Sequence, residues 1–125
     1  MADQSRRFEA GPDPFGRMWK VQFRWLQTGI SIRHADTVDV KFFVTPDGGA
    51  TEEKVIALPH SMLLKYTREH GIPLTDPWCM RIAAAHLKHM IETSEDMDKS
   101  LVTITAEELA AYDQQTHGVT VPQRA

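Results

Sequence analysis

The sequence predicts an α+β domain, in which an N-terminal antiparallel β-meander of three to four strands is covered on one face by two to three C-terminal helices. Two periodicities support this class. Apolar and polar residues alternate with a period of two in the first half of the chain, and after Pro59 the apolar period becomes helical. The strands also precede the helices instead of alternating with them, which is the order found in α+β proteins.

The composition is that of an ordinary globular domain. The chain has 125 residues, 42% hydrophobic and 25% charged, with 14 Lys and Arg against 17 Asp and Glu and a formal net charge of −3. One domain with its own core is expected at this length. No apolar run approaches the roughly 20 residues of a membrane span, and no signal peptide is recognisable. A single cysteine cannot form an intramolecular disulfide. We therefore expect a cytoplasmic protein without a membrane partner.

The two ends of the chain lack periodicity. Residues 1–16 contain two prolines and two glycines, and we interpret them as a flexible N-terminal arm. Residues 17–118 are expected to form the single α+β domain. Residues 119–125 are expected to be a frayed C-terminal tail.

The first strand is predicted from alternation of apolar with polar side chains: Trp19, Val21, Phe23 and Trp25 against Lys20, Gln22 and Arg24. A turn at Thr28-Gly29 should follow, because glycine accepts the positive φ of a tight hairpin. A two-residue loop there would pair Trp25 with Ile32 and Phe23 with His34. All of the apolar residues of both strands would then share one face.

Alternation resumes at Ile30 and continues to Val44. A continuous strand of 15 residues would greatly exceed the usual roughly 5–6, so we expect a bend or break near residues 34–37. A turn at residues 45–49 then leads to a further strand at Lys54–Leu58, which completes the meander.

Helical signals fill the second half of the chain. A helix that begins after Pro59 is expected to end at Gly71, a residue suited to a left-handed C-terminal cap. The best-defined helix should run from Pro77 to about Thr93. Thr75 or Asp76 can cap it, and proline is favoured at the first helical position.

Two shorter elements are expected near the C-terminus. Ser100–Ile104 is a β-prone stretch, and the capping box Thr105–Glu108 should open a last helix that ends at His117-Gly118. The second flank of the Pro77 helix is moderately apolar and invites another helix or a second subunit. We expect a homodimer, since twofold pairs are the commonest oligomers.

The first candidate site is the pair His34 and Asp36. By parity both lie on the apolar face with Ile32 and Val38, where an unsatisfied ionisable pair would be costly. As a site, His34 would be an acid, a base or a metal ligand oriented by Asp36. The alternative, which we favour, is a turn or bulge at residues 35–36 with His34 at a sheet edge.

The second candidate is the trio Cys79, His86 and His89 on the Pro77 helix. Zinc takes such ligands, but no recognised metal-ligand spacing is met, so we expect neither a metal nor another cofactor. Cys79 alone lies in the first helical turn, where a helix N-terminus lowers a thiol pKa. Its apolar neighbours predict burial instead, and a buried thiol is inert.

No catalytic motif accompanies these residues. We therefore interpret the chain as a non-catalytic binding or interaction module that acts as a homodimer and engages a protein or small-molecule partner. The candidate binding residues are Arg33, His34 and the three tryptophans, since aromatic residues are enriched at interfaces; the tryptophans are Trp19, Trp25 and Trp78.

Two other interpretations compete with this one. A small enzyme or metal-binding protein would use the His34 and Asp36 pair together with the helix histidines. A single-strand nucleic-acid protein would stack bases on Trp19 and Trp25 beside Arg24. The acidic net charge argues against nucleic acid as a partner.

Overall fold

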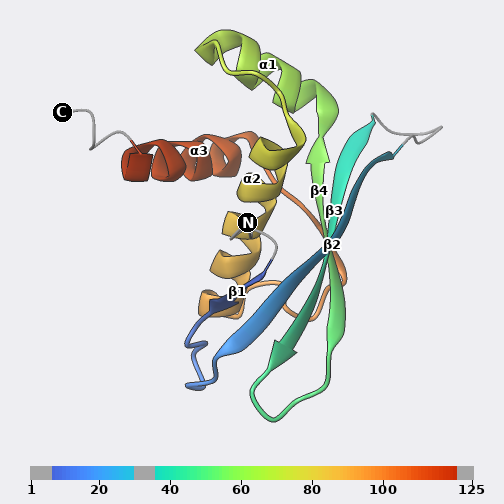
Figure 1. The fold of residues 1–125 in the computed structure, drawn as a ribbon, viewed down its shortest axis with the longest axis vertical. Helices are drawn as coiled ribbons and strands as arrows, with labels where there is room; N and C mark the ends of the chain where they lie inside the picture. Colours follow the sequence, from blue (N-terminus) through green and yellow to red (C-terminus); the bar gives the residue numbers. More distant parts are fainter. Residues whose placement is uncertain (1–6, 30–35, 121–125) are drawn as a thin grey trace.

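A computed structural model describes residues 7–29 and 36–120 and confirms the α+β class. Five strands form one sheet, in the order β1-β2-β3-β4-β5, and three helices lie together on one of its faces (Figure 1). The strands are β1 (Arg7–Ala10), β2 (Trp19–Gly29), β3 (Thr37–Pro46), β4 (Glu52–Pro59) and β5 (Leu101–Thr103). The helices are α1 (His60–His70), α2 (Asp76–Thr93) and α3 (Ala106–Thr120).

The sheet is an antiparallel meander with one parallel addition. β1 to β4 follow one another as antiparallel neighbours, whereas β5 pairs in parallel with β4. A parallel neighbour needs a crossover connection, and here α1 and α2 supply it. The β-prone stretch expected at residues 100–104 is therefore an edge strand.

The hairpin between β2 and β3 turns later than we predicted. Thr28 and Gly29 lie within β2, where they pair with Val38 and Thr37, and the connection therefore covers residues 30–36. The predicted partner of Phe23, His34, is wrong: Phe23 pairs with Phe42. Alternation alone fixes the face of a residue but not its partner, so a longer connection kept the pattern and changed the register.

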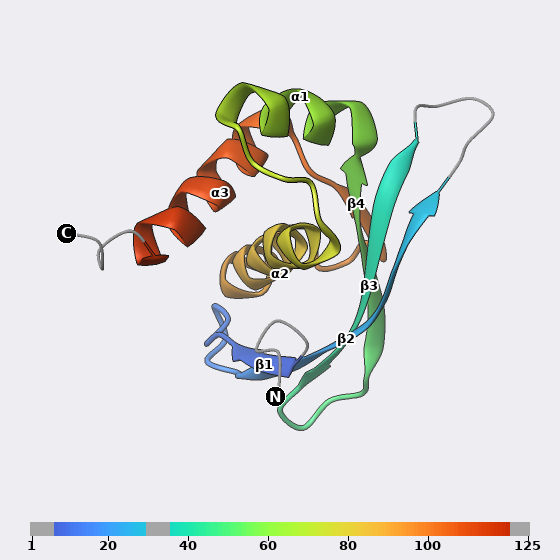
Figure 2. The same ribbon diagram turned by 45° about the horizontal axis from the view of Figure 1, so that its top comes forward.

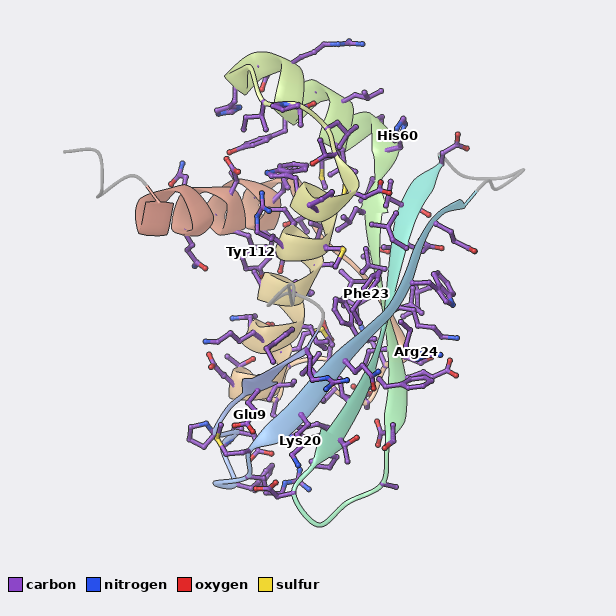
Figure 3. All side chains as sticks on the ribbon, in the orientation of Figure 1. Glu9, Lys20, Phe23, Arg24, His60 and Tyr112 are labelled. Carbon is purple, nitrogen blue, oxygen red and sulfur yellow. The ribbon has the colours of Figure 1, made fainter. Side chains whose placement is uncertain are left out.

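A β-bulge at Arg24 divides β2 into two halves. The register shifts between Phe23, which pairs with Phe42, and Trp25, which pairs with Lys41. A bulge adds one residue and so reverses the alternation beyond it. Phe23 points toward α2, and Arg24 points away from the helices (Figure 3). Trp25 thus lies on the face opposite to Trp19, contrary to the sequence prediction.

Residues 7–16, which we expected to be a flexible arm, instead form β1 and an ordered turn. The turn is organised by the buried carboxylate of Asp13, which accepts hydrogen bonds from the Phe15 amide, the Arg17 amide and guanidinium, and the Trp19 indole, all at 2.9–3.0 Å. Burial alone would raise its pKa, but these donors lower the pKa of Asp13 to about 2.

The core lies between the sheet and α2. The predicted helix at Pro77 is confirmed, with Thr75 accepting a hydrogen bond from the Trp78 amide at 3.3 Å. α2 runs across the sheet, and α3 packs on its far side (Figure 2). The largest fully buried side chains come from both layers; they include Phe42, Ile56, Leu58, Leu63, Ile82, Leu87, Met90 and Leu109. None of the helices described is long and apolar enough to cross a membrane.

Candidate binding surface on the uncovered sheet face

One face of the sheet carries no helix. α1, α2 and α3 all lie on the other face, and the two views agree in this (Figures 1 and 2). Antiparallel sheets often leave one face to solvent, and that face is then normally polar. Here it also carries aromatic and aliphatic side chains, so it is the natural place to look for a partner.

An apolar belt crosses the middle of this face. Strand pairing aligns Trp25 of β2 with Lys41 of β3, Lys41 with Val55 of β4, and Val55 with Leu101 of β5. The Leu101 side chain is 55% exposed and Trp25 is 36% exposed. The Lys41 ammonium lies 5.2 Å from the centre of the Trp25 ring. We call this row of four residues the apolar belt, since three of the four are apolar and Lys41 lies between Trp25 and Val55.

Charged side chains of both signs flank the belt. The guanidinium of Arg24 lies 4.9 Å from the centre of the Phe43 ring, within the range of a cation–π contact. Lys41 forms an ion pair with Glu53 at 3.0 Å, and Asp39 accepts a hydrogen bond from the Thr37 hydroxyl at 2.8 Å. Arg24 forms no ion pair within the described part of the chain.

A hollow opens at the β1 end of the same face. Its volume is about 630 Å³, and its walls come from β1, β2, β3 and the turn after β3. Figure 3 shows Glu9 and Lys20 at this end, with Arg24 farther along β2. We call this space the cationic hollow; its main lining residues are Arg7, Glu9, Lys20, Gln22, Phe43, Thr45 and Thr51.

The residues of the first sequence-predicted site are not brought together in the part that the structure describes. Arg33 and His34 lie outside the described residues. Asp36 is exposed just before β3, and its backbone carbonyl accepts a hydrogen bond from the His60 amide at 2.8 Å. The acid–base hypothesis for His34 and Asp36 therefore remains a prediction.

Two of the three tryptophans proposed as binding residues are buried. The Trp19 indole donates to Asp13 at 3.0 Å, and the Trp78 indole donates to Asp113 at 3.0 Å. Asp113 also accepts from the Tyr66 hydroxyl at 2.7 Å. Burial, and then the Asp113 carboxylate, raise the pKa of Tyr66 to about 12, which keeps this donor protonated. Trp25 alone among the three presents a surface.

The trio proposed for zinc is spread between the core and the surface. Cys79 is buried, and burial together with the charge of Asp76 raises its pKa to about 12. His86 is buried, with Nδ1 at 2.6 Å from the Tyr112 hydroxyl, whereas His89 is exposed and pairs with Glu95 at 3.0 Å. Within residues 7–29 and 36–120, no group of three or more His, Cys, Asp or Glu side chains is arranged to hold a metal.

Most of the uncovered face was not predicted from the sequence. Trp25 and Arg24 were considered as contact residues, but Phe43 and Leu101 were not singled out as surface residues. One signal was present: Phe42 and Phe43 are consecutive, so one of the two must leave the core face of any strand.

Comparisons with known proteins add no relationship. A scan against protein-family models found no match, and searches of curated proteins and of solved structures found no similar protein.

Proposed function

We propose that this protein is a non-catalytic interaction module that acts as a homodimer, with the uncovered sheet face as its subunit interface. The observation that carries the proposal is the apolar belt, because Trp25 and Leu101 expose large apolar side chains on a face without a helix. Exposed apolar side chains that share one face with charged side chains around them are typical of interaction sites.

The charges of this face favour a second copy of the chain as the partner. A twofold interface brings a surface against itself, so it must be self-complementary. The face meets this condition because cations and carboxylates are interspersed around the belt; they are Arg24 and Lys41 against Asp39 and Glu53. A strongly basic nucleic-acid surface would lack so many carboxylates.

The aromatic side chains also favour a protein partner over bases. Single-stranded nucleic acids stack on free aromatic faces. The Trp25 ring, the aromatic side chain of the apolar belt, already has the Lys41 ammonium beside it.

The area of the face suits a dimer. The five strands together have 36 residues, and at roughly 3.4 Å per residue, with strands roughly 4.8 Å apart, they present a plane on the order of 600 Å². Side chains roughen that plane and increase its accessible area. Standard interfaces bury about 800 Å² on each partner.

The test is the mass in solution, measured by native mass spectrometry and light scattering. We expect a dimer for the wild type and a monomer for Trp25→Glu combined with Leu101→Glu, since two carboxylates would then oppose their symmetry copies. Lys65→Glu, an exposed charge change on α1, should leave the dimer intact. Circular dichroism would show that each variant is folded.

Three outcomes would contradict the proposal. The wild type could be a monomer at all concentrations, the double variant could remain dimeric, or the Lys65→Glu control could dissociate as well. A monomer that instead binds a single-stranded oligonucleotide, with affinity falling steeply in salt, would support the nucleic-acid alternative.

A further inference from the structure

We propose that the cationic hollow binds a small organic anion that has a flat apolar body, such as an aromatic carboxylate or phosphate. This inference goes beyond dimer formation, because it concerns a ligand at the β1 end of the face and not the apolar belt. The hollow is of ligand size: its volume of about 630 Å³ lies inside the roughly 300–1,000 Å³ of small-molecule sites.

The cations of the hollow have no internal partner. Within the described residues, no hydrogen bond or ion pair involves the side chains of Arg7 or Lys20. Glu9 is the single carboxylate in the lining, so cations outnumber acids there by two to one. Of the other lysines, Lys41, Lys88 and Lys99 each pair with a carboxylate, whereas the exposed Lys65 of α1 forms no ion pair within the described residues.

The pairing register brings the two cations to adjacent strands. Arg7 of β1 lies opposite Gln22 of β2, and Glu9 lies opposite Lys20. Arg7 and Lys20 therefore occupy diagonal positions on one face, within reach of a single anionic group. A guanidinium and an ammonium on such a diagonal can bind two oxygens of one carboxylate or phosphate with charge-assisted hydrogen bonds.

The rest of the lining fits the body of such a ligand. The Phe43 ring supplies an apolar wall, and the Arg24 guanidinium already lies on that ring. The hydroxyls of Thr45 and Thr51 are 2.8 Å apart at the far side of the hollow. A site with an apolar wall and a few polar groups that fix orientation is the usual form of a small-molecule site.

The experiment uses three probes with one apolar body and different head groups: naphthoate, naphthyl phosphate and the neutral naphthalenemethanol. Amide chemical shifts of the wild-type protein would be followed by NMR during each titration. We expect one or both anions to shift the amides of β1 and the β1 end of β2, and the neutral probe to bind at least tenfold more weakly. Comparison of the two anions separates a carboxylate site from a phosphate site.

Variants locate the site. Lys20→Gln and Arg7→Gln should each weaken the anion about tenfold, because each removes a charge-assisted hydrogen bond. Lys65→Gln on α1 is the matched control and should not change the affinity. The spectra themselves report whether each variant is folded.

Several results would overturn the inference: equal binding of the neutral probe, shifts centred on the belt or the helices, or unchanged affinity in both Lys20→Gln and Arg7→Gln. Light scattering on the same samples distinguishes this failure from failure of the dimer. A dimer that binds no anion would contradict only the ligand proposal, and a monomer that binds the anion would contradict only the dimer proposal.

Discussion

The two faces of the sheet contain the same kinds of side chain and use them differently. On the covered face, Trp19 is buried and its indole donates to the buried carboxylate of Asp13. On the uncovered face, Trp25 lies beside the Lys41 ammonium and remains partly exposed. Each tryptophan lies next to a charged group, but Trp19 belongs to the core and Trp25 belongs to the surface. The difference is set by the Arg24 bulge, which reverses the orientation of β2 between them.

The largest effect should come from two adjacent phenylalanines. Phe42 is fully buried against α2 and meets Phe23 edge to face, so Phe42→Ala should lower the free energy of unfolding by about 3–5 kcal/mol. Phe43→Ala, on the uncovered face, should lower it by less than about 1 kcal/mol. Urea denaturation of both variants measures the contrast. Similar losses for the two would mean that Phe43 is also covered in the folded protein.

The next effect concerns the carboxylate that holds α3. Asp113→Ala would leave the buried donors of Tyr66 and Trp78 without an acceptor, which should cost about 2–4 kcal/mol. Asp113→Asn, which keeps one acceptor oxygen, should cost less. Urea unfolding measures both variants, and hydrogen exchange would show whether protection is lost first in α3. An Asp113→Ala variant as stable as the wild type would contradict this account.

A smaller effect should appear as acid sensitivity. Burial, partly opposed by Glu108 of α3 and by Glu95 and Asp96, lowers the pKa of His86 below its ordinary 6.5, and His89 lowers it further. His86 is therefore neutral in the folded protein and takes up its proton more readily when unfolded. Stability should be greatest above pH 6.5 and fall below it.

His86→Gln removes this titration and leaves a polar group near the Tyr112 hydroxyl, so its stability should vary less between neutral and mildly acidic pH. Thermal unfolding across that range checks the slope. A second loss is expected at lower pH, between 3.8 and about 2, because Asp13 there binds a proton in the unfolded chain while it is still ionised in the folded protein. An unchanged slope in His86→Gln would assign the first loss to another group.

The smallest expected effect is that the thiol of Cys79 does not react with a thiol reagent in the folded protein. Cys79 is buried and its pKa is raised to about 12, so the folded protein should not react with a thiol reagent at neutral pH. The same thiol should react quickly after unfolding in urea. Rapid labelling of the folded protein would contradict the burial of Cys79 and place its thiol on an accessible surface.

Local sequence patterns predicted the elements better than their alignment. The strand at Trp19 and the helix at Pro77 carry their own signals, a period of two and a proline after a capping threonine. The bulge at Arg24 has no comparable signal, because an extra residue is recognised only against its partner strand. Asp13 was missed for a similar reason: its four donors surround it only when the turn has formed.

The candidate surface was less predictable than the fold. Trp25 was named from its residue type, but its neighbours on the uncovered face come from strands as distant in the chain as β2 and β5. Which side chains lie beside one another across a sheet depends on the strand register, and the register predicted for the hairpin of β2 and β3 was wrong. The cationic hollow likewise needs β1, whose residues showed no periodicity in the sequence.

The bulge also defines how β2 can change without loss of the fold. Before Arg24, odd-numbered positions of the strand belong to the interior, and after it Leu26, opposite Val40, does. Mutagenesis libraries would therefore need two different polar and apolar alternations in one strand. Deletion of Arg24 would remove the extra residue and join the two halves into one regular alternation, in which every other side chain of β2 keeps its present face and partner. The offset between the two halves of the strand therefore resides in one residue.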